Sequence, residues 1–310
     1  MAAVVGLSVT LSRTAAASHV ADGLTSGHSH ALPPVPLNPI HFLSQWRVDV
    51  LAVVLAALLV AAYAEGLYAL HRRGTRWPTW RTVSFSCGVA TLLLAGCSGI
   101  GTYSVVLAIA TLIHGVSLLL VVPTLLILGR PITLLVVSAE PDRLRAAWFR
   151  VLLGLRRMAV ERASTNPGIP VVVALSMVIT IGGTQLLPNA LWPFWGRLAI
   201  DVALLIVGSW VCAVVIHVAQ GRGRLRLLPA ATLAGGIIAL FAIVIAVPTV
   251  LHAQYFGYFL PPYTTDLLTT QRLGAGICIV ITSGWFLLVV LATSQRLVAP
   301  ERRQRVHSSS

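Results

Sequence analysis

Residues 48–70 read VDVLAVVLAALLVAAYAEGLYAL, and residues 71–81 continue as HRRGTRWPTWR. The first stretch is long enough to cross the roughly 30 Å hydrocarbon core of a bilayer as a helix, at about 1.5 Å per residue. The second stretch gathers arginine and tryptophan side chains, which is typical of a helix end at the membrane–water interface. This pattern predicts one membrane-spanning helix followed by a basic loop.

The same alternation of apolar and arginine-rich stretches recurs along the chain. We expect seven spans, at about residues 48–70, 82–100, 104–128, 169–187, 198–219, 228–251 and 273–293. The composition agrees, because 57% of the 310 residues are hydrophobic and only 10% are charged, against about a quarter in soluble domains. The sequence therefore predicts an all-α, polytopic membrane domain over residues 46–296, built as a bundle of seven transmembrane helices.

The basic residues predict the orientation of this domain. All 22 are arginines, and they give a net charge of +13, which in a soluble protein would suggest nucleic-acid binding. Here 18 of them lie in the loops after the first, third and fifth spans and in the C-terminal tail, against four on the other side. Because short arginine-rich loops stay in the cytoplasm, we expect an N-out, C-in protein whose partner is the lipid bilayer and not nucleic acid.

Three segments flank or interrupt the spans. Residues 1–45 are rich in Ser, His, Gly and Pro and are expected to form a flexible extracytoplasmic arm. Residues 132–168 mix arginines with leucines and valines, which predicts an amphipathic cytoplasmic segment that faces anionic lipid. Residues 297–310 form a basic cytoplasmic tail.

Four ionisable side chains inside the predicted spans are candidate functional groups, because a charge in a bilayer is costly. Asp49 and Asp201 lie within one turn of outer span ends, where they can reach water or pair with neighbouring arginines. Glu65 either reaches toward the cytoplasmic arginines or acts as a buried proton or metal group. His114 lies ten residues into the third span, about 15 Å deep. A neutral hydrogen-bonded histidine, a metal ligand and a proton relay all stay open there.

Histidines also occur in the predicted arm, where Gly27-His28-Ser29-His30 places two of them close together. Paired imidazoles in such a tail can bind copper or zinc, so His28 and His30 join His114 as candidate metal ligands. The four cysteines lie in apolar runs without CxxC spacing, which supports neither a disulfide framework nor a zinc site. No nucleophile with a base and no phosphate-binding glycine loop is recognisable, so we expect no enzyme.

Several short motifs follow one another in a characteristic order and spacing. They are Gln45-Trp46-Arg47-Val48-Asp49, Arg72-Arg73-Gly74-Thr75-Arg76-Trp77-Pro78, Ser98-Gly99-Ile100-Gly101-Thr102-Tyr103-Ser104, Val122-Pro123-Thr124-Leu125-Leu126-Ile127-Leu128-Gly129-Arg130-Pro131 and Gln271-Arg272-Leu273-Gly274-Ala275-Gly276. With these motifs the chain resembles the CtaG-type cytochrome c oxidase assembly family of bacterial inner membranes, from about residue 37 to residue 298.

The resemblance implies a seven-span protein of the bacterial plasma membrane that helps to mature a haem–copper oxidase by handling copper on the outer side. The family's third span carries a His-Met-x-x-His motif, whose positions fall here on Thr111 to Gly115. Both family histidines are therefore absent, and His114 occupies a spacer position. Residues 197–205 also lack the histidines that the family has at the start of span five, and Thr270 replaces the aspartate of the last motif.

Two interpretations follow, and we favour the first. Either the chain is a divergent relative that no longer binds copper in the membrane, or His114 and the histidines of the arm have replaced the family's ligands. In both cases we expect a chaperone that assists copper-centre maturation or the assembly of oxidase subunits. A copper or small-solute permease, and a non-metal scaffold that uses residues 132–168 as its contact face, are the alternatives.

Overall fold

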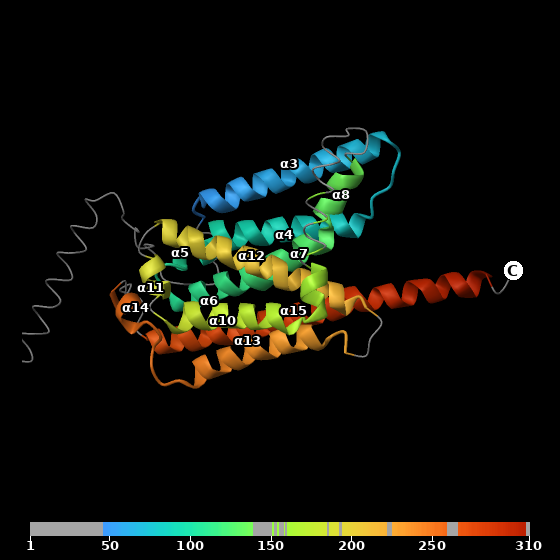
Figure 1. Cartoon of the computed structure of the whole chain (residues 1–310). Coiled ribbons are helices and arrows are strands. Elements are labelled where there is room, and N and C mark those ends of the chain that lie inside the picture. The colour runs from blue at the N-terminus through green and yellow to red at the C-terminus, as the bar shows by residue number, and fades with distance from the viewer. Residues whose placement is uncertain are drawn as a thin grey trace, which may run out of the picture.

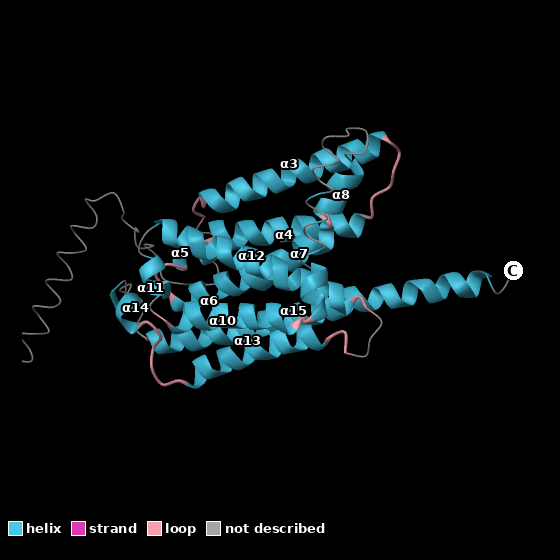
Figure 2. Ribbon diagram, viewed as in Figure 1, coloured by secondary structure: helices cyan, strands magenta, loops and turns pink. Residues whose placement is uncertain are grey.

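The computed structural model describes residues 46–138, 151, 154, 158, 160–184, 186–191, 194–221, 225–258 and 266–307. Every regular element within these residues is a helix, which confirms the predicted all-α class. Figures 1 and 2 show the long helices lying side by side along one common direction. The predicted arm, with His28 and His30, and residues 139–150 of the predicted cytoplasmic segment lie outside the described residues.

Six helical stretches in the described part of the chain are long and apolar enough to cross a membrane, which makes the protein a multi-pass membrane protein. They are α3 (Val50–Arg72), α4 (Thr79–Cys97) with α5 (Gly99–Tyr103), α6 (Ala108–Val116) with η1 (Ser117–Val121), α7 (Val122–Gly129) and α8 (Pro131–Ser138), then α12 (Phe194–Ala219), α13 (Leu228–Ala246) and α15 (Leu267–His307). A seventh apolar helix, α10 (Gly168–Gly183), has 16 residues. Two short helices, α11 (Leu186–Leu191) and α14 (Ala253–Tyr258), lie at the end of the bundle where α3 begins (Figure 1).

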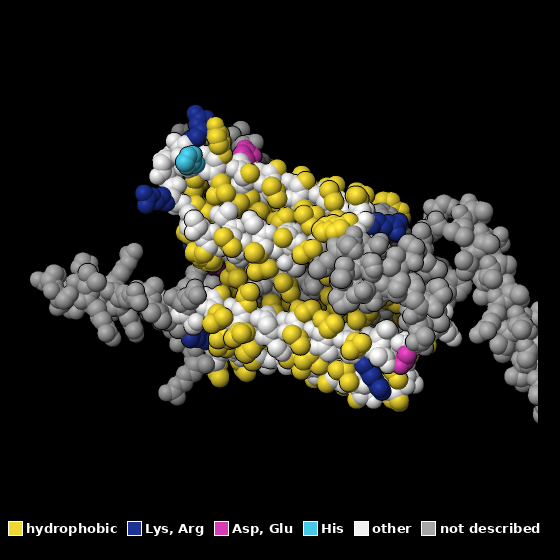
Figure 3. All heavy atoms as spheres, turned by 180° about the vertical axis from the view of Figure 1, so that it is seen from behind, with side chains coloured by type: hydrophobic (Ala, Val, Ile, Leu, Met, Phe, Trp, Pro, Cys, Tyr) yellow, Lys and Arg dark blue, Asp and Glu magenta, His cyan; other side chains and the backbone are white. Residues whose placement is uncertain are grey.

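The core of the bundle lies between the central helices. Helix α15 packs against α6 and α13, α4 packs against α7, and α12 packs against η1 and α7. Tyr103, Leu119, Leu120, Leu233 and Ile237 are among the fully buried side chains of this core. Figure 3 shows that the face of the helices seen in this view is also largely hydrophobic, while charged side chains lie near its two ends. A surface of this kind suits hydrocarbon as the surrounding solvent.

A π-helical turn interrupts the third predicted span, residues 104–128. In η1 the N–H of Val122 bonds to the carbonyl of Ser117, one residue further back than in an α-helix. Pro123 has no N–H to offer to the carbonyl of Leu119, and this missing bond explains a local widening of the helix. The thiol of Cys212 lies 3.8 Å from the carbonyl oxygens of both Leu119 and Leu120, so helix α12 contacts the backbone that the proline leaves open.

The third span continues further than the sequence predicts. Arg130 adopts a left-handed conformation with φ of 51°, and Pro131 then starts α8, which packs against α3. The guanidinium of Arg73 donates to the carbonyls of Val137 and Ser138, at 3.1 and 2.5 Å, at the end of α8. The first residues of the expected amphipathic segment, 132–138, thus belong to an apolar helix that packs against α3.

The sixth predicted span, residues 228–251, ends early at Ala246. Pro248 follows at once, and a proline does not allow the helix to continue. The buried side chain of Gln271 replaces the lost helical partners. Its Oε1 accepts the N–H of Leu251 at 2.7 Å, and its Nε2 donates to the carbonyl of Thr249 at 3.4 Å.

Candidate functional site

The most polar place in the interior is a buried contact between His114 of α6 and Asp201 of α12. Nε2 of His114 lies 2.9 Å from Oδ1 of Asp201, and Nδ1 lies 2.9 Å from the carbonyl oxygen of Ala95. The two residues are only 6% and 5% exposed. Both ring nitrogens of His114 therefore have protein partners.

The partners restrict where the protons of this pair reside. A carbonyl oxygen can only accept, so Nδ1 of His114 carries a proton and donates it to Ala95. The contact with Asp201 then holds one further proton. Either an imidazolium donates to a carboxylate, or a protonated carboxyl group donates to a neutral imidazole, and both forms hold the same number of protons.

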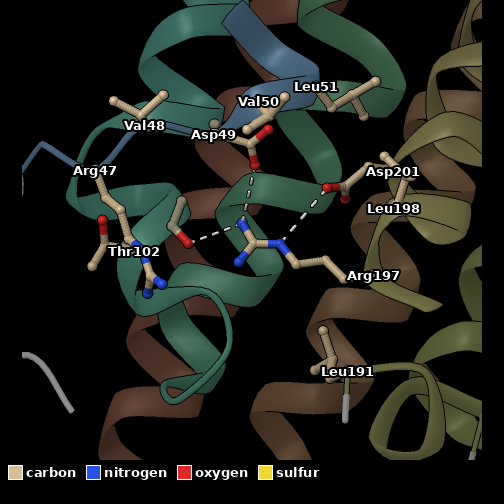
Figure 4. Close-up of a pocket in the computed structure, with 12 residues that line it drawn as sticks. Arg47, Val48, Asp49, Val50, Leu51, Thr102, Leu191, Arg197, Leu198 and Asp201 are labelled. Carbon is tan, nitrogen blue, oxygen red and sulfur yellow. Dashed lines mark hydrogen bonds and ion pairs between the residues drawn. The ribbon is translucent and has the colours of Figure 1, made fainter. Parts of the chain in front are cut away.

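Arg197 links this pair to the start of α3 (Figure 4). Its Nε lies 3.8 Å from Oδ2 of Asp201, and its Nη2 lies 3.8 Å from Oδ2 of Asp49. Nη2 also donates to the carbonyl of Gly101 at 3.0 Å. We call Asp49, His114, Arg197 and Asp201 the ion cluster. With His114 as imidazolium, its two positive and two negative charges balance, which lowers the cost of holding them in a membrane.

Local structure positions each member of the ion cluster. Asp49 is the N-cap of α3, and its Oδ1 accepts the N–H of Ala52 at 3.0 Å. Arg197 and Asp201 are four residues apart and so share one face of α12. The α4–α5 corner that carries the Gly101 carbonyl is tight, because a Cβ at Gly101 would lie 1.8 Å from the carbonyl oxygen of Gly96. Only glycine fits there.

The sequence prediction missed the His114–Asp201 contact because it placed two helix starts incorrectly. Spans starting at residues 104 and 198 put His114 ten residues deep and Asp201 three residues deep. In the structure α6 begins at Ala108 and α12 at Phe194, so the two residues lie six and seven residues from the helix starts. At equal depth they can meet. The pairing of Asp201 with its neighbouring arginine, Arg197, is confirmed. Asp49 pairs with the same Arg197, which is distant in sequence.

A pocket opens beside the ion cluster at the end of the bundle where α3 begins. Its volume is about 140 Å³. Asp49, Thr102, Arg197 and Asp201 are among the residues that line it (Figure 4). Beyond His114 the side chain of Ser117 is buried, and the buried leucines 118–120 follow it. In the described residues the buried charged groups therefore occupy one end of the bundle.

Three further titratable groups lie outside the ion cluster. Glu65 is on the exposed face of α3, toward the opposite end of that helix. The carbonyl of Gly182 accepts from Nε2 of His252 at 2.9 Å, and burial lowers the pKa of His252 from its ordinary value of 6.5. Burial also raises the pKa of Tyr255, whose hydroxyl donates to the carbonyl of Val105 at 2.9 Å.

The residues around His114, as the structure arranges them, do not fit a copper site. Both imidazole nitrogens are occupied, and at the neighbouring family positions Thr111 and Gly115 the threonine hydroxyl donates to the carbonyl of Leu107 while the glycine has no side chain. In the described residues no group of three or more His, Cys, Asp and Glu side chains is arranged to hold a metal ion. Metal binding by His114, and by His28 and His30 outside the described residues, stays a prediction.

Comparison with known proteins finds relatives along most of the chain. The chain is 24% identical over 279 residues to the uncharacterized protein ML1998 of Mycobacterium leprae. The aligned part covers 88% of this chain and 42% of the relative. It is 27% identical over 286 residues to the uncharacterized proteins Mb0105 of Mycobacterium bovis and MT0111 of Mycobacterium tuberculosis, again over 87% of this chain and 42% of the relative. The chain thus spans less than half the length of these relatives.

No solved structure matches the chain. The family model of the cytochrome c oxidase caa3 assembly factor, Caa3_CtaG, matches residues 61–299, which include the four long helices after α3 and most of α15. That match covers well over half of the sequence and includes three of the four members of the ion cluster. The protein therefore belongs to the cytochrome c oxidase caa3 assembly factor family.

Proposed function

We propose that this protein assists the assembly of a haem–copper oxidase in the bacterial plasma membrane by binding oxidase subunits, and that it does not carry copper through its helix bundle. The second half of the proposal rests on one observation, which is that both ring nitrogens of His114 already have hydrogen-bond partners. Copper needs imidazole or sulfur donors, and both imidazole nitrogens of His114 are held by Asp201 and Ala95 at 2.9 Å. The family match supports the first half.

In the topology that we propose, the chain crosses the membrane seven times, with α3 starting outside and α15 ending in the cytoplasm. Helix α10 has 16 residues, about 24 Å at helical rise, yet it runs alongside α12 and α13 (Figure 1). With α10 counted as a crossing, successive helices alternate in direction throughout. The arginine-rich loops after α3 and α12 then share one side. Reporter fusions after residues 75, 166, 222 and 298 should all report the cytoplasm, and fusions after residues 105, 192 and 260 should report the outside.

The functional test is complementation of a bacterial strain that lacks this gene. We expect the strain to contain less assembled oxidase, measured by its haem absorbance and subunit content, and the wild-type gene to restore it. Copper retained by the purified full chain after Cu(I) loading and a chelator wash is measured in parallel. One tightly bound copper that His114→Gln removes, while the protein level stays unchanged, would refute the proposal.

A permease is the second candidate, because polar groups from three long helices do converge in the ion cluster. Transport requires a polar path across the membrane, and the cluster is followed by the buried leucines 118–120. Uptake of Cu(I) into proteoliposomes separates the two functions. We expect the rate to equal that of empty liposomes, and a protein-dependent rate that Arg197→Gln changes would favour the permease.

A further inference from the structure

Two apolar pockets adjoin between α6 and α10, and residues of both helices line each of them. One has a volume of about 110 Å³ and extends toward α12, and the other has a volume of about 200 Å³ and extends toward α13 and α15. They share lining residues from both helices, among them Thr111, Leu112, Val178 and Gly182. Because protein interiors are normally close-packed, adjoining apolar space of this size needs an explanation.

Glycines create much of this space. Gly115 lines the first pocket, Gly183 the second and Gly182 both, and a Cβ at any of the three would meet no other atom within 4 Å. Adjacent glycines in a membrane helix commonly allow close helix packing. The structure shows that they end α10 beside open space instead.

The second pocket has an opening that faces the surrounding membrane. Helices α10 and α13 touch closely at one level, where a Cβ on Gly236 would lie 2.7 Å from Cδ1 of Leu175. Ile179 lies one turn further along α10 and is 52% exposed, and Ile243 lies about two turns further along α13 and is 59% exposed. Both residues line the pocket. The helices therefore leave an apolar entrance between Ile179 and Ile243.

His252 supplies a hydrogen-bond acceptor at the edge of the second pocket. His252 lines it, and Nε2 of His252 donates to the carbonyl of Gly182. A histidine that stays neutral keeps a lone pair on Nδ1, and among the described residues that nitrogen has no hydrogen-bond partner. Gln271, the other polar residue at this end, already bonds the backbone at the end of α13.

The charges around both pockets argue for a neutral occupant. His114 and Asp201 of the ion cluster line the first pocket and are paired with each other. Arg197 lines it too, but it already contacts two carboxylates and a carbonyl. Its charge is therefore not available to an anionic headgroup. The second pocket has no arginine among its lining residues. A ligand here needs a hydrocarbon chain and an uncharged hydrogen-bond donor.

We propose that these pockets bind one molecule of a neutral long-chain or isoprenoid alcohol. Its chain enters between Ile179 and Ile243 and lies against α6 and the glycines of α10, and its hydroxyl group donates to Nδ1 of His252. The first pocket borders His114, Arg197 and Asp201 of the ion cluster, but occupation of the site does not depend on the proposed role in oxidase assembly.

The test is photolabelling of the purified full chain in nanodiscs of synthetic phosphatidylcholine. The probe is farnesol carrying a diazirine and an alkyne, and labelled peptides are identified by mass spectrometry. We expect labelling to concentrate on residues 108–119, 171–183 and 240–252, and unlabelled farnesol to compete. Palmitate at pH 7.5, where it is anionic, should compete at least about fivefold more weakly, because its charge has no partner in the pocket.

The decisive test uses variants whose added side chains fill the pockets. Gly182→Leu places a side chain in open space in both pockets and should weaken labelling about tenfold, because the chain loses room for several methylene groups. Gly115→Leu fills only the first pocket and gives a second, independent variant. The matched control is Gly235→Leu, an exposed helix position on α13 that also has open space but lines neither pocket, and it should label like the wild type.

Three results would overturn the proposal. The first is equal labelling of the wild type and of both filling variants, with the melting temperatures of all of them preserved. The second is labelling spread evenly over exposed helix faces such as that of α3. The third is equal competition by palmitate, which would show that the site does not select a neutral alcohol.

Discussion

The contact between His114 and Asp201 should be one of the strongest pairwise couplings in the bundle. The perturbation is a double-mutant cycle with His114→Leu, Asp201→Leu and the combination of both. Leucine resembles both side chains in size and removes their hydrogen bonds without leaving a large cavity. All free energies refer to unfolding of the full chain.

The magnitude follows from what each substitution leaves behind. His114→Leu leaves Asp201 buried without its 2.9 Å partner and the carbonyl of Ala95 without a donor. Removing one member of a buried pair costs about 3–5 kcal/mol. We expect the lower end, about 3 kcal/mol, because Arg197 remains 3.8 Å from Asp201. Asp201→Leu should cost a similar amount, since it leaves a donor of His114 and one side of Arg197 without an acceptor.

The double variant removes both members at once. Replacing a whole buried ion pair by apolar side chains is often close to neutral, although the carbonyl of Ala95 still loses its partner and that costs about 1–3 kcal/mol. We therefore expect the double variant to be at least about 2 kcal/mol more stable than the sum of the single variants implies.

The assay is unfolding by SDS in mixed micelles, followed by tryptophan fluorescence and far-UV circular dichroism. His217 supplies the control, because it lies exposed near the other end of α12. The changes that His217→Leu and Asp201→Leu cause in the free energy of unfolding should add within about 0.5 kcal/mol. Additivity of the same size for His114→Leu and Asp201→Leu would refute the assignment of a buried, coupled pair.

Three further predictions concern other places in the fold. Gly208→Ala would put a Cβ about 2.2 Å from the carbonyl oxygen of Leu119, so it should cost about 1–3 kcal/mol in the same SDS assay, and an unchanged midpoint would contradict this close helix contact. Burial lowers the pKa of His252, so the unfolded chain binds that proton more tightly. Stability should be full above about pH 6.5 and fall as the pH drops below it, and an identical pH slope in His252→Gln would show that this histidine is not responsible. At the start of α15, hydrogen bonds from the side chain and backbone of Thr269 hold the pKa of Asp266 below its usual 3.8. The contribution of Asp266 to the stability of the first turn of α15 should be present above that pH and be lost as the pH falls through the lower, folded-state pKa. The loss is measured as faster amide exchange in that turn. In Asp266→Asn the exchange should show no such change with pH.

The sequence by itself determined the helical class and the multi-pass character of this protein. These follow from local properties, because a bilayer accepts only segments that satisfy their own backbone hydrogen bonds and carry apolar side chains for some 20 residues. The order of short motifs was also enough to indicate the family. Even the departure at Thr111 and Gly115, where the family has histidines, could be read directly from the sequence.

Helix ends depended on the tertiary structure. The carbonyl that Pro123 leaves open is met by Cys212, which is 89 residues away, and Gln271 compensates the early end of α13. Neither partner lies within the span that it completes, so a reading of hydropathy along the chain placed these boundaries several residues away from where they occur.

Only the tertiary structure decided which polar groups meet. His114 and Asp201 are 87 residues apart, and their contact depends on α6 and α12 starting at equal depth. A shift of four residues at each start moves a side chain by about 6 Å along the helix axis, which is more than a hydrogen bond allows. Burial makes such a pairing obligatory, but hydropathy along a single chain cannot show which two helices lie side by side. That is why Asp49, His114 and Asp201 could be found in the sequence as candidates and their association with Arg197 in one ion cluster could not.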